Sequence, residues 1–183
     1  MLYTRKGDDG TTKTFGCNQR ISKSSSVAEA LGALDETNSN LGLCKVVSEK
    51  SDFTLAGKKF SEIVHGVQEN LFIVQAEVAG ADKTISQEKI KEIEMFIDAA
   101  EKELPPIKTF FISGGTELAA RFDVARTVSR RAERRVILAR TEGMTKISDN
   151  TAAYLNRLSS LLYALARLTN HKSLIKEPSP KYE

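Results

Sequence analysis

The residues best suited to chemistry are the arginines of ARTVSRRAERR, residues 125–135, where five arginines and one glutamate occur in eleven residues. Every basic residue between Arg121 and Arg140 is arginine and none is lysine. A guanidinium group carries a planar fork of N–H donors that matches a phosphate or a carboxylate. The stretch therefore indicates a negatively charged partner, and four alternatives are open: nucleic acid, a membrane surface, water with its ions, or a small polyanion.

The overall charge makes nucleic acid the weaker alternative. The chain has 27 basic and 24 acidic side chains and a formal net charge of +3 at pH 7, whereas a dedicated nucleic-acid binder usually has a larger excess. No segment approaches the ~20 apolar residues that span a bilayer, and the N-terminus lacks the apolar core of a secretory signal. We therefore expect a cytoplasmic protein with no nucleic-acid and no membrane partner.

Histidine and cysteine offer little chemistry in this chain. The two cysteines, Cys17 and Cys44, have no metal-type spacing, and we expect free thiols. The two histidines, His65 and His171, lie far apart in the sequence, which disfavours a zinc site or a Ser-His-Asp triad. Chemistry in this protein is therefore expected to depend on carboxylates, arginines and a cofactor or substrate.

At 100° per residue the arginine helix has three distinct sides. The alanines and valines fall within about 80° of arc and form the side expected to be buried: Ala125, Val128, Ala132, Val136 and Ala139. Arg126, Arg130 and Arg134 follow one flank, and Arg131 and Arg135 follow the other. A solvated face remains open at this point, because helical charge runs usually face water.

Three other groups are candidates for a site. Asp35 lies at the edge of an apolar helical stripe, where it is either a surface residue or the partner of an arginine. Asn156 lies between the apolar side of its helix and Ser160. The N-terminal YTRKGDDGTTK offers backbone N–H groups, threonine hydroxyls and lysines, the chemistry of a loop that wraps phosphates. It is not a Walker A motif, and a mobile tail is an equal alternative.

Helical periodicity predicts the elements that must position these groups. Helices are expected at 26–48, 53–78, 86–104, 116–141 and 150–170, with caps at Ser26, Ser86, Thr116 and either Ser148 or Asp149. The sequence predicts an all-α fold, a five-helix bundle in one domain. We expect an N-terminal loop segment at 1–25, the bundle at 26–171 and a flexible tail at 172–183.

Taken in order, six motifs closely resemble the PduO-type ATP:cob(I)alamin adenosyltransferases, from Tyr3 to about Arg167. They are YTRKGDDGTT (3–12), RISK (20–23), LGALDETNSNLG (31–42), FFISGGT (110–116), ARTVSRRAERR (125–135) and YLNRLSSLLYALAR (154–167). The arginine pattern followed by NRLS is the most specific of them.

The resemblance implies an activity and an assembly. The family transfers the 5′-deoxyadenosyl group of ATP, with Mg²⁺, to the cobalt of reduced cobalamin and releases triphosphate. Its five-helix bundle forms a homotrimer with active sites between adjacent subunits. A cobalamin reductase and an adenosylcobalamin-dependent enzyme are the implied partners. Two alternatives are a non-enzymatic helical module that binds nucleic acid or phosphorylated partners, and a family member that mainly stores or delivers adenosylcobalamin.

The resemblance also implies roles for individual residues. Asp35 and Arg126 match an ion pair across the subunit interface, Phe110 matches the aromatic residue that closes the lower face of the corrin, and Arg130 belongs to the reactive site. The residues that match the ATP site are Thr4, Arg5, Lys6, Gly7, Thr12, Lys13, Lys23, Arg130, Arg131, Ala132, Glu133, Arg134 and Asn156.

This chain departs from the family pattern at four positions. Ser113 stands where the family often has proline, so the loop behind Phe110 is expected to be less rigid. Ser160 replaces a common aspartate, which removes a carboxylate. Cys17 replaces a frequent glycine and Thr37 a common leucine. None of these changes removes a group that the chemistry requires.

Overall fold

The structure is a computed structural model that describes residues 2–14 and 20–182. Cys17 lies outside the described residues. The described part forms five helices and two short hairpins, in agreement with the predicted all-α bundle. The helices are α1 (Ser26–Ser48), α2 (Phe60–Val78), α3 (Gln87–Glu103), α4 (Glu117–Thr141) and α5 (Asp149–Lys172).

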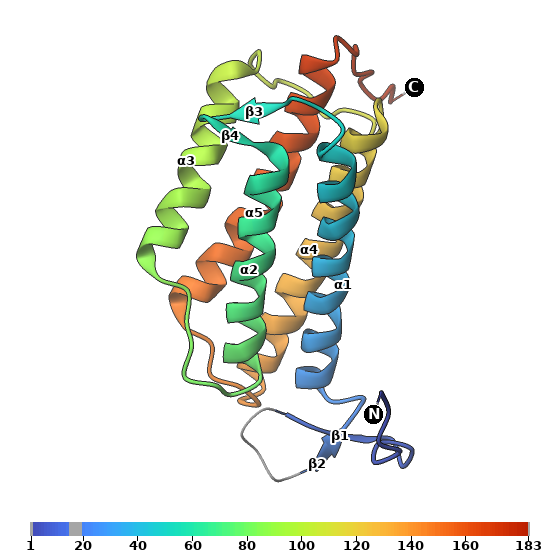
Figure 1. The fold of residues 1–183 in the computed structure, drawn as a ribbon, viewed down its shortest axis with the longest axis vertical. Coiled ribbons are helices and arrows are strands. Elements are labelled where there is room, and N and C mark those ends of the chain that lie inside the picture. Colours follow the sequence, from blue (N-terminus) through green and yellow to red (C-terminus); the bar gives the residue numbers. More distant parts are fainter. Residues whose placement is uncertain (1, 15–19, 183) are drawn as a thin grey trace.

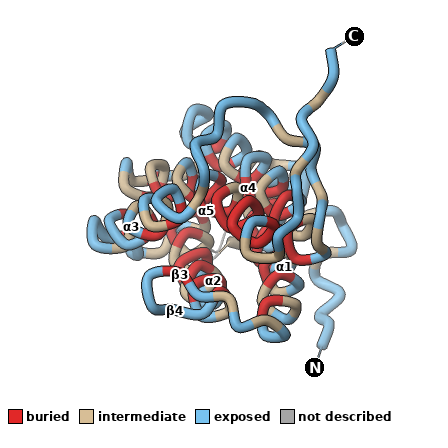
Figure 2. Tube along the Cα trace, turned by 90° about the horizontal axis from the view of Figure 1, so that it is seen from above, coloured by how far each residue is buried: buried red, intermediate tan, exposed pale blue. Residues whose placement is uncertain are grey.

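The helices run alongside one another and bury their apolar sides in a common core (Figures 1 and 2). α4 packs between α1 and α5, and α5 also packs against α3. The C-terminal half of α5 is buried on nearly all sides, from Leu161 to Asn170 with the exception of the half-buried Tyr163. Most polar groups of a helix that is enclosed in this way have to find partners within the protein.

The helix starts are specified mostly by short polar side chains. Thr116 caps α4 by accepting from the Ala119 N–H, and Ser148 caps α5 by accepting from the Thr151 N–H, as predicted. Ser86 occupies the N-cap position of α3, also as predicted. The predicted cap of α1 is wrong by one residue, because Ser25 rather than Ser26 accepts from the Ala28 N–H.

The second helix begins later than predicted. Residues 54–59 form a hairpin instead of helix, with β3 (Thr54–Leu55) antiparallel to β4 (Lys58–Lys59). Ala56 and Gly57 form its turn with φ values of 49° and 78°. Such a turn has positive φ at both central residues, which a right-handed helix cannot contain. α2 therefore starts at Phe60.

A second hairpin lies in the N-terminal segment, at the end of the bundle where α1 begins (Figure 1). β1 (Thr11–Lys13) pairs antiparallel with β2 (Arg20–Ser22), with Thr12 opposite Ile21. The segment expected to be an irregular loop is therefore partly held by backbone pairing. No helix in the described ranges is long and apolar enough to cross a membrane.

The C-terminal segment, which the sequence predicts to be a flexible tail, makes contacts with the rest of the chain. It lies beside the loop that joins α3 to α4, at the opposite end of the bundle from the N-terminal hairpin (Figure 1). The Ile112 N–H donates to the Pro178 carbonyl at 2.9 Å, and the Ile175 N–H donates to the Asn170 carbonyl at 2.9 Å. These contacts attach residues 173–182 to both α5 and the loop.

The turn at the end of this loop depends on glycine. Gly115 has φ of 96°, and a Cβ placed on it would collide with the Asn170 side chain. The Asn170 amide donates to the Gly114 carbonyl at 2.8 Å and accepts from the Thr116 N–H at 3.0 Å. The side chain of Asn170 thus occupies the space beside Gly115 and fixes the start of α4.

We expect Gly115→Ala to destabilise the protein more than Gly143→Ala. Both positions have positive φ, which costs roughly 1–2 kcal/mol with a side chain, but nothing lies within 4 Å of a Cβ at Gly143. The collision with Asn170 should add about 1–3 kcal/mol at Gly115. Urea unfolding at a fixed protein concentration measures the difference, and equal losses in the two variants would contradict the steric argument.

Candidate functional site

The arginines of α4 divide between its two neighbouring helices. On the α1 side, Arg131 forms an ion pair with Glu36, and Arg135 lies 3.9 Å from Glu29. On the α5 side, the Glu133 carboxylate accepts from the Asn156 amide at 3.1 Å. Two of the five arginines in residues 125–135 are thus engaged with glutamates of α1.

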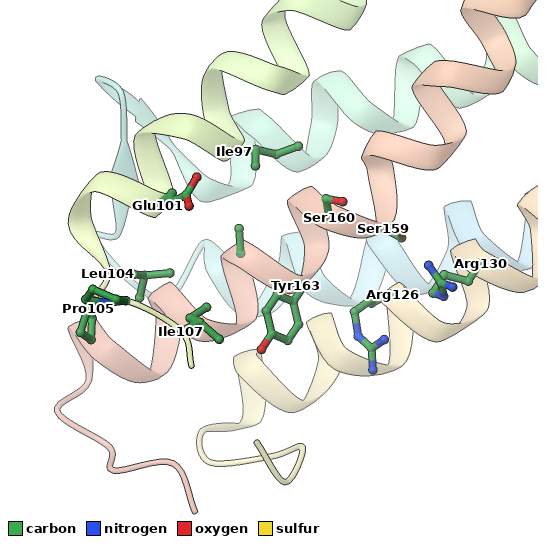
Figure 3. Close-up of a pocket in the computed structure, with 12 residues that line it drawn as sticks. Ile97, Glu101, Leu104, Pro105, Ile107, Arg126, Arg130, Ser159, Ser160 and Tyr163 are labelled. Carbon is green, nitrogen blue, oxygen red and sulfur yellow. The ribbon is translucent and has the colours of Figure 1, made fainter. Parts of the chain in front are cut away.

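Arg126 and Arg130 line a cavity of about 400 Å³ where α3, α4 and α5 meet (Figure 3). Ser159, Ser160 and Tyr163 of α5 face them, and apolar side chains of α3 and the following loop form the opposite wall. These apolar residues are Ile97, Leu104, Pro105, Pro106 and Ile107. The cavity therefore has a cationic side and a mainly apolar side that also carries the Glu101 carboxylate, which suits a ligand with both polar and apolar surface.

A second cavity of about 500 Å³ lies beside the first and shares Ile107, Arg126 and Tyr163 with it. Phe110 and Phe111 line this second cavity, together with the charged side chains of Asp123 and Arg167. Phe110 is 78% exposed, which is unusual for a phenylalanine and leaves its ring free to contact another molecule. The two cavities together form a continuous candidate site along the α4–α5 groove.

Beneath this site, Arg167 and Asp123 form a buried ion pair at 2.6 Å, with side chains 2% and 6% exposed. The Glu177 carboxylate of the C-terminal segment also contacts Arg167. The guanidinium carbon of Arg167 lies 5.2 Å from the ring centre of Tyr163 and 5.8 Å from that of Phe111. The cluster thus pairs the buried Arg167 with two carboxylates and two aromatic rings.

Arg126 lies at the edge of this cluster. Its Nε is 3.8 Å from Asp123, a charge contact that is too long for a hydrogen bond. Its guanidinium carbon is 6.0 Å from the Tyr163 ring centre. The buried Nε has no hydrogen-bond partner among the described residues. Since a buried donor without a partner costs roughly 1–3 kcal/mol, this group is suited to an acceptor from another molecule.

The N-terminal segment forms a compact polar loop of its own. The Lys23 ammonium group donates to the Gly7 carbonyl at 2.7 Å, and a Cβ at Gly7 would lie 3.0 Å from this nitrogen. Glycine at position 7 therefore permits the close approach. Thr4, Arg5, Lys6 and Lys13 are exposed, Thr12 is half-buried, and Arg5 has φ of 59°.

Arg20 organises this loop. Its guanidinium donates to the Thr11 carbonyl at 3.0 Å and also to the Lys6 carbonyl. Asp9 accepts from the N–H and the hydroxyl of Thr11 at 3.0 and 2.7 Å, and these hydrogen bonds hold the pKa of the Asp9 carboxyl below its usual value. Gly7, Thr11 and Lys23 are therefore held close together.

Some predicted site residues are not brought together within one chain. In the ranges 2–14 and 20–182, no hydrogen bond or ion pair joins the N-terminal loop to Arg130–Arg134, and none involves the Asp35 side chain. Asp35 is exposed on α1, whereas Arg126 is half-buried between α4 and α5. Ala132 is fully buried, so its methyl group packs in the core.

Among the described residues, the remaining reactive groups do not form a second site. Burial raises the pKa of the Cys44 thiol to about 12, so it stays protonated and unreactive at neutral pH. Burial also raises the pKa of the Tyr163 hydroxyl, an effect that the nearby Arg167 partly opposes. The described residues contain no group of three or more histidine, cysteine, aspartate or glutamate side chains that could hold a metal ion.

The comparison with known proteins decides the family. A family model described as cobalamin adenosyltransferase matches residues 2–169. The chain belongs to this family.

Individual relatives support the same family assignment. The corrinoid adenosyltransferase of Bacillus subtilis is 36% identical over 177 residues, covering 94% of this chain and 88% of the relative. The corrinoid adenosyltransferase PduO of Citrobacter freundii is 36% identical over 192 residues, covering 99% of this chain and 54% of the relative. The chain thus spans about half the length of the PduO relatives it matches.

The fold matches solved structures of the family as well. A variant of a PduO-type ATP:corrinoid adenosyltransferase from Lactobacillus reuteri, complexed with cobalamin and ATP, aligns with a TM-score of 0.88 at 28% identity. The match covers 100% of this chain and 97% of that chain. The five-helix bundle of the adenosyltransferase family is therefore the fold of this chain.

The sequence patterns did not identify several residues of the candidate site. Arg167, Asp123, Tyr163 and Asn170 were not singled out, although Arg167 is a lone charge in the otherwise apolar run LLYALARL of α5. A charge in such a run has to be paired, and this is the signal that could have identified it. Glu177 carries no comparable signal, because it lies in a charged, proline-containing segment.

The departures from the family pattern fall at the edge of the site. Ser160 is exposed and lines the first cavity beside Arg130, so its hydroxyl replaces a carboxylate there. Ser113 is exposed and lines the second cavity next to Gly114. Thr37 is buried, and its hydroxyl donates to the Ala33 carbonyl at 2.8 Å, so the change at this position is one of packing.

We expect Asp123→Asn to cost about 3–5 kcal/mol of folding free energy, because it removes one carboxylate from the buried Arg167. Glu94→Gln is the matched control: Glu94 lies 3.2 Å from Arg157 in an ion pair whose two side chains are each 42% exposed. Exposed pairs of this kind contribute at most about 1 kcal/mol. Urea unfolding measures the loss of folding free energy in each variant. A loss in Asp123→Asn that is smaller than the loss in Glu94→Gln would contradict the role of Asp123.

Proposed function

We propose that the protein is an ATP:corrinoid adenosyltransferase that transfers the 5′-deoxyadenosyl group of ATP to the cobalt of reduced cobalamin. The observation that carries the proposal is the groove along α4. Arg126 lines both cavities there, Arg130 lines the first and the exposed Phe110 ring lines the second, in a chain of the cobalamin adenosyltransferase family. Relatives of this family are named as corrinoid adenosyltransferases.

In this proposal the triphosphate of ATP is held by cations and backbone N–H groups. The N-terminal loop supplies Lys6, Lys13 and Lys23, together with the small Gly7 and the hydroxyls of Thr4 and Thr12. The α4 segment supplies Arg130 and Arg134, while Glu133 and Asn156 contact each other beside them. Fixed positive charges of this kind stabilise a triphosphate as its leaving oxygen gains charge.

The corrinoid would occupy the two adjoining cavities. A corrin is a large, mainly apolar ring, and Ile97, Leu104 and Ile107 with the two prolines offer an apolar wall. Phe110 would cover the lower face of the ring and keep an axial ligand from cobalt. Because an axial ligand makes cob(II)alamin harder to reduce, its exclusion by an apolar side chain favours formation of the reactive cob(I)alamin.

The chemistry then needs no nucleophile from the protein. Reduced cobalt supplies the electron pair for the new bond to C5′ of ATP, and the pair of the breaking C5′–O bond leaves with triphosphate. The task of the protein is to hold C5′ close to cobalt and to stabilise the leaving group. The lack of an activated cysteine or of a nucleophile–base pair in the described site is compatible with this division of labour.

We propose that Mg²⁺ accompanies ATP. Mg²⁺ in nucleotide sites commonly binds substrate phosphates with few protein carboxylates, and the described residues offer no ready cluster of metal ligands. The phosphates would therefore be its main ligands, and the ion would neutralise part of their charge. Glu133 is the carboxylate closest in sequence to the proposed phosphate-binding arginines.

We also propose that the complete site forms between subunits of a homotrimer. The N-terminal loop and Arg130–Arg134 share no hydrogen bond or ion pair in the described chain, which is the arrangement expected when each subunit contributes one half. Asp35 is exposed, and Val46, which lies about 20° from it around α1, is 54% exposed. An Asp35 from one subunit would supply the missing acceptor to Arg126 of the next.

A nucleic-acid or phosphoprotein-binding module is not favoured. Such a module would need the arginines free along one face, whereas Arg131 and Arg135 contact Glu36 and Glu29 of α1. The family relationship also points to the transferase. The cytoplasmic location, the reductase and the adenosylcobalamin-dependent enzyme that receives the product stay predictions.

The deciding experiment is anaerobic mixing of the protein with chemically reduced cobalamin and Mg-ATP, followed through the corrinoid absorption spectrum. We expect adenosylcobalamin to form only with ATP present, and formation to stop when EDTA removes Mg²⁺, because the phosphate charge is then uncompensated. No adenosylcobalamin, together with tight duplex binding at physiological salt, would instead support the nucleic-acid module.

We expect Asp35→Ala and Arg126→Ala to raise the KM for cobalamin about tenfold or more, by loss of a charged hydrogen bond, and to leave the KM for ATP nearly unchanged. Arg140→Ala is the control, because Arg140 pairs with Asp149 at the far end of α4. Steady-state kinetics with each substrate varied in turn measures both constants. An unchanged cobalamin KM in both variants would refute the pair.

A further inference from the structure

Besides its backbone hydrogen bonds, the C-terminal segment is joined to the bundle by the side chain of Glu177. Its Oε1 contacts the buried Arg167 guanidinium and accepts from the Asn170 amide at 2.6 Å. Glu177 is largely buried, with a side chain 13% exposed, although its neighbours Lys176 and Pro178 are exposed. A single carboxylate oxygen therefore joins a segment outside the helices to the charged cluster beneath the candidate site.

This segment in turn holds the loop that carries Phe110. Between Pro105 and Ser113, the hydrogen bonds found among the described residues are both made with the C-terminal segment. The Ile112 N–H donates to the Pro178 carbonyl at 2.9 Å, and the hydroxyls of Thr109 and Ser179 lie 3.0 Å apart. These two contacts lie on either side of Phe110 and Phe111 in the sequence.

The Glu177 carboxylate is also connected, through Asn170, to the C-terminal end of this loop. Asn170, which Glu177 contacts, fixes the turn at Gly114 and Thr116. Arg167, its other partner, lies against the Phe111 ring. Glu177 therefore links the C-terminal segment and the C-terminal end of the Phe110 loop to one buried point.

We propose that Glu177 is a positioning residue for the reaction: it anchors residues 173–182 to Arg167 and Asn170, and this anchored segment sets the position of Phe110 over the corrinoid cavity. The proposal rests on the proposed function for the identity of the ligand. The anchoring itself concerns only contacts within the chain, so it is testable without any substrate.

The first test is hydrogen–deuterium exchange of the free protein at the Ile112 amide. In Glu177→Ala we expect exchange at Ile112 to accelerate about tenfold or more, because a hydrogen bond to a charged group is lost at the anchor. Lys176→Ala is the matched control, since Lys176 is the exposed neighbour, and it should exchange like the parent. Unchanged exchange in Glu177→Ala, or equal acceleration in the control, would overturn the proposal.

Glu177→Gln provides the second variant. Both partners of Glu177 contact its Oε1, and glutamine keeps an acceptor oxygen at this position without the charge. We expect Ile112 exchange in Glu177→Gln to lie between those of the parent and Glu177→Ala. If Glu177→Ala does not fold, Glu177→Gln takes its place in the exchange test. Ile112 exchange in Glu177→Gln equal to that of the parent would then count against the anchor.

The second test separates positioning from general stability. With preformed cob(I)alamin and Mg-ATP, Glu177→Ala should raise the KM for cobalamin about tenfold and leave the KM for ATP within about twofold, because the nucleotide groups lie farther along α4. Equal rises in both constants would indicate a structural role and overturn the positioning role. A parent protein that forms no adenosylcobalamin would contradict the proposed function instead, while the exchange test would still decide the anchor.

Discussion

The buried ion pair between Arg167 and Asp123 is the interaction on which the candidate site depends. Removing a charged group from water costs several kcal/mol per ion unless the protein supplies partners, and α5 places Arg167 where almost no water reaches it. The guanidinium therefore requires Asp123 of α4 and Glu177 of the C-terminal segment. The burial of the Arg167 charge thus requires α5, α4 and the C-terminal segment to meet at this point.

The consequences of this requirement extend into both cavities. Asp123 accepts from the Gly114 N–H at 3.3 Å, so the pair also positions the turn at the end of the Phe110 loop. Asp123 lies beside Arg126 without satisfying its Nε. The buried cluster therefore holds Arg126 in place while leaving it a donor for another molecule, and this combination of fixed position and free donor is what a binding site needs.

The arginine helix shows how one element can serve a core and a site at once. Its alanine and valine side is buried, one arginine flank faces the glutamates of α1, and the other faces α5 and the cavities. Helical periodicity predicted these sides because side chains recur every 3.6 residues whatever surrounds them. It could not predict which flank would meet glutamates, since this depends on the packing angle of the neighbouring helices.

The sequence by itself determined the five helices, most of their caps and, through six ordered motifs, the family and the candidate ligands. These features are local, or they are residue types that one chemistry requires. Only the tertiary structure decided that residues 54–59 turn back before α2, that Arg167 needs two carboxylates, and that Glu177 attaches the C-terminal segment to the loop. Each of these depends on contacts between residues far apart in the chain, or on a turn whose geometry overrides the helical pattern, and periodicity contains no information about such contacts.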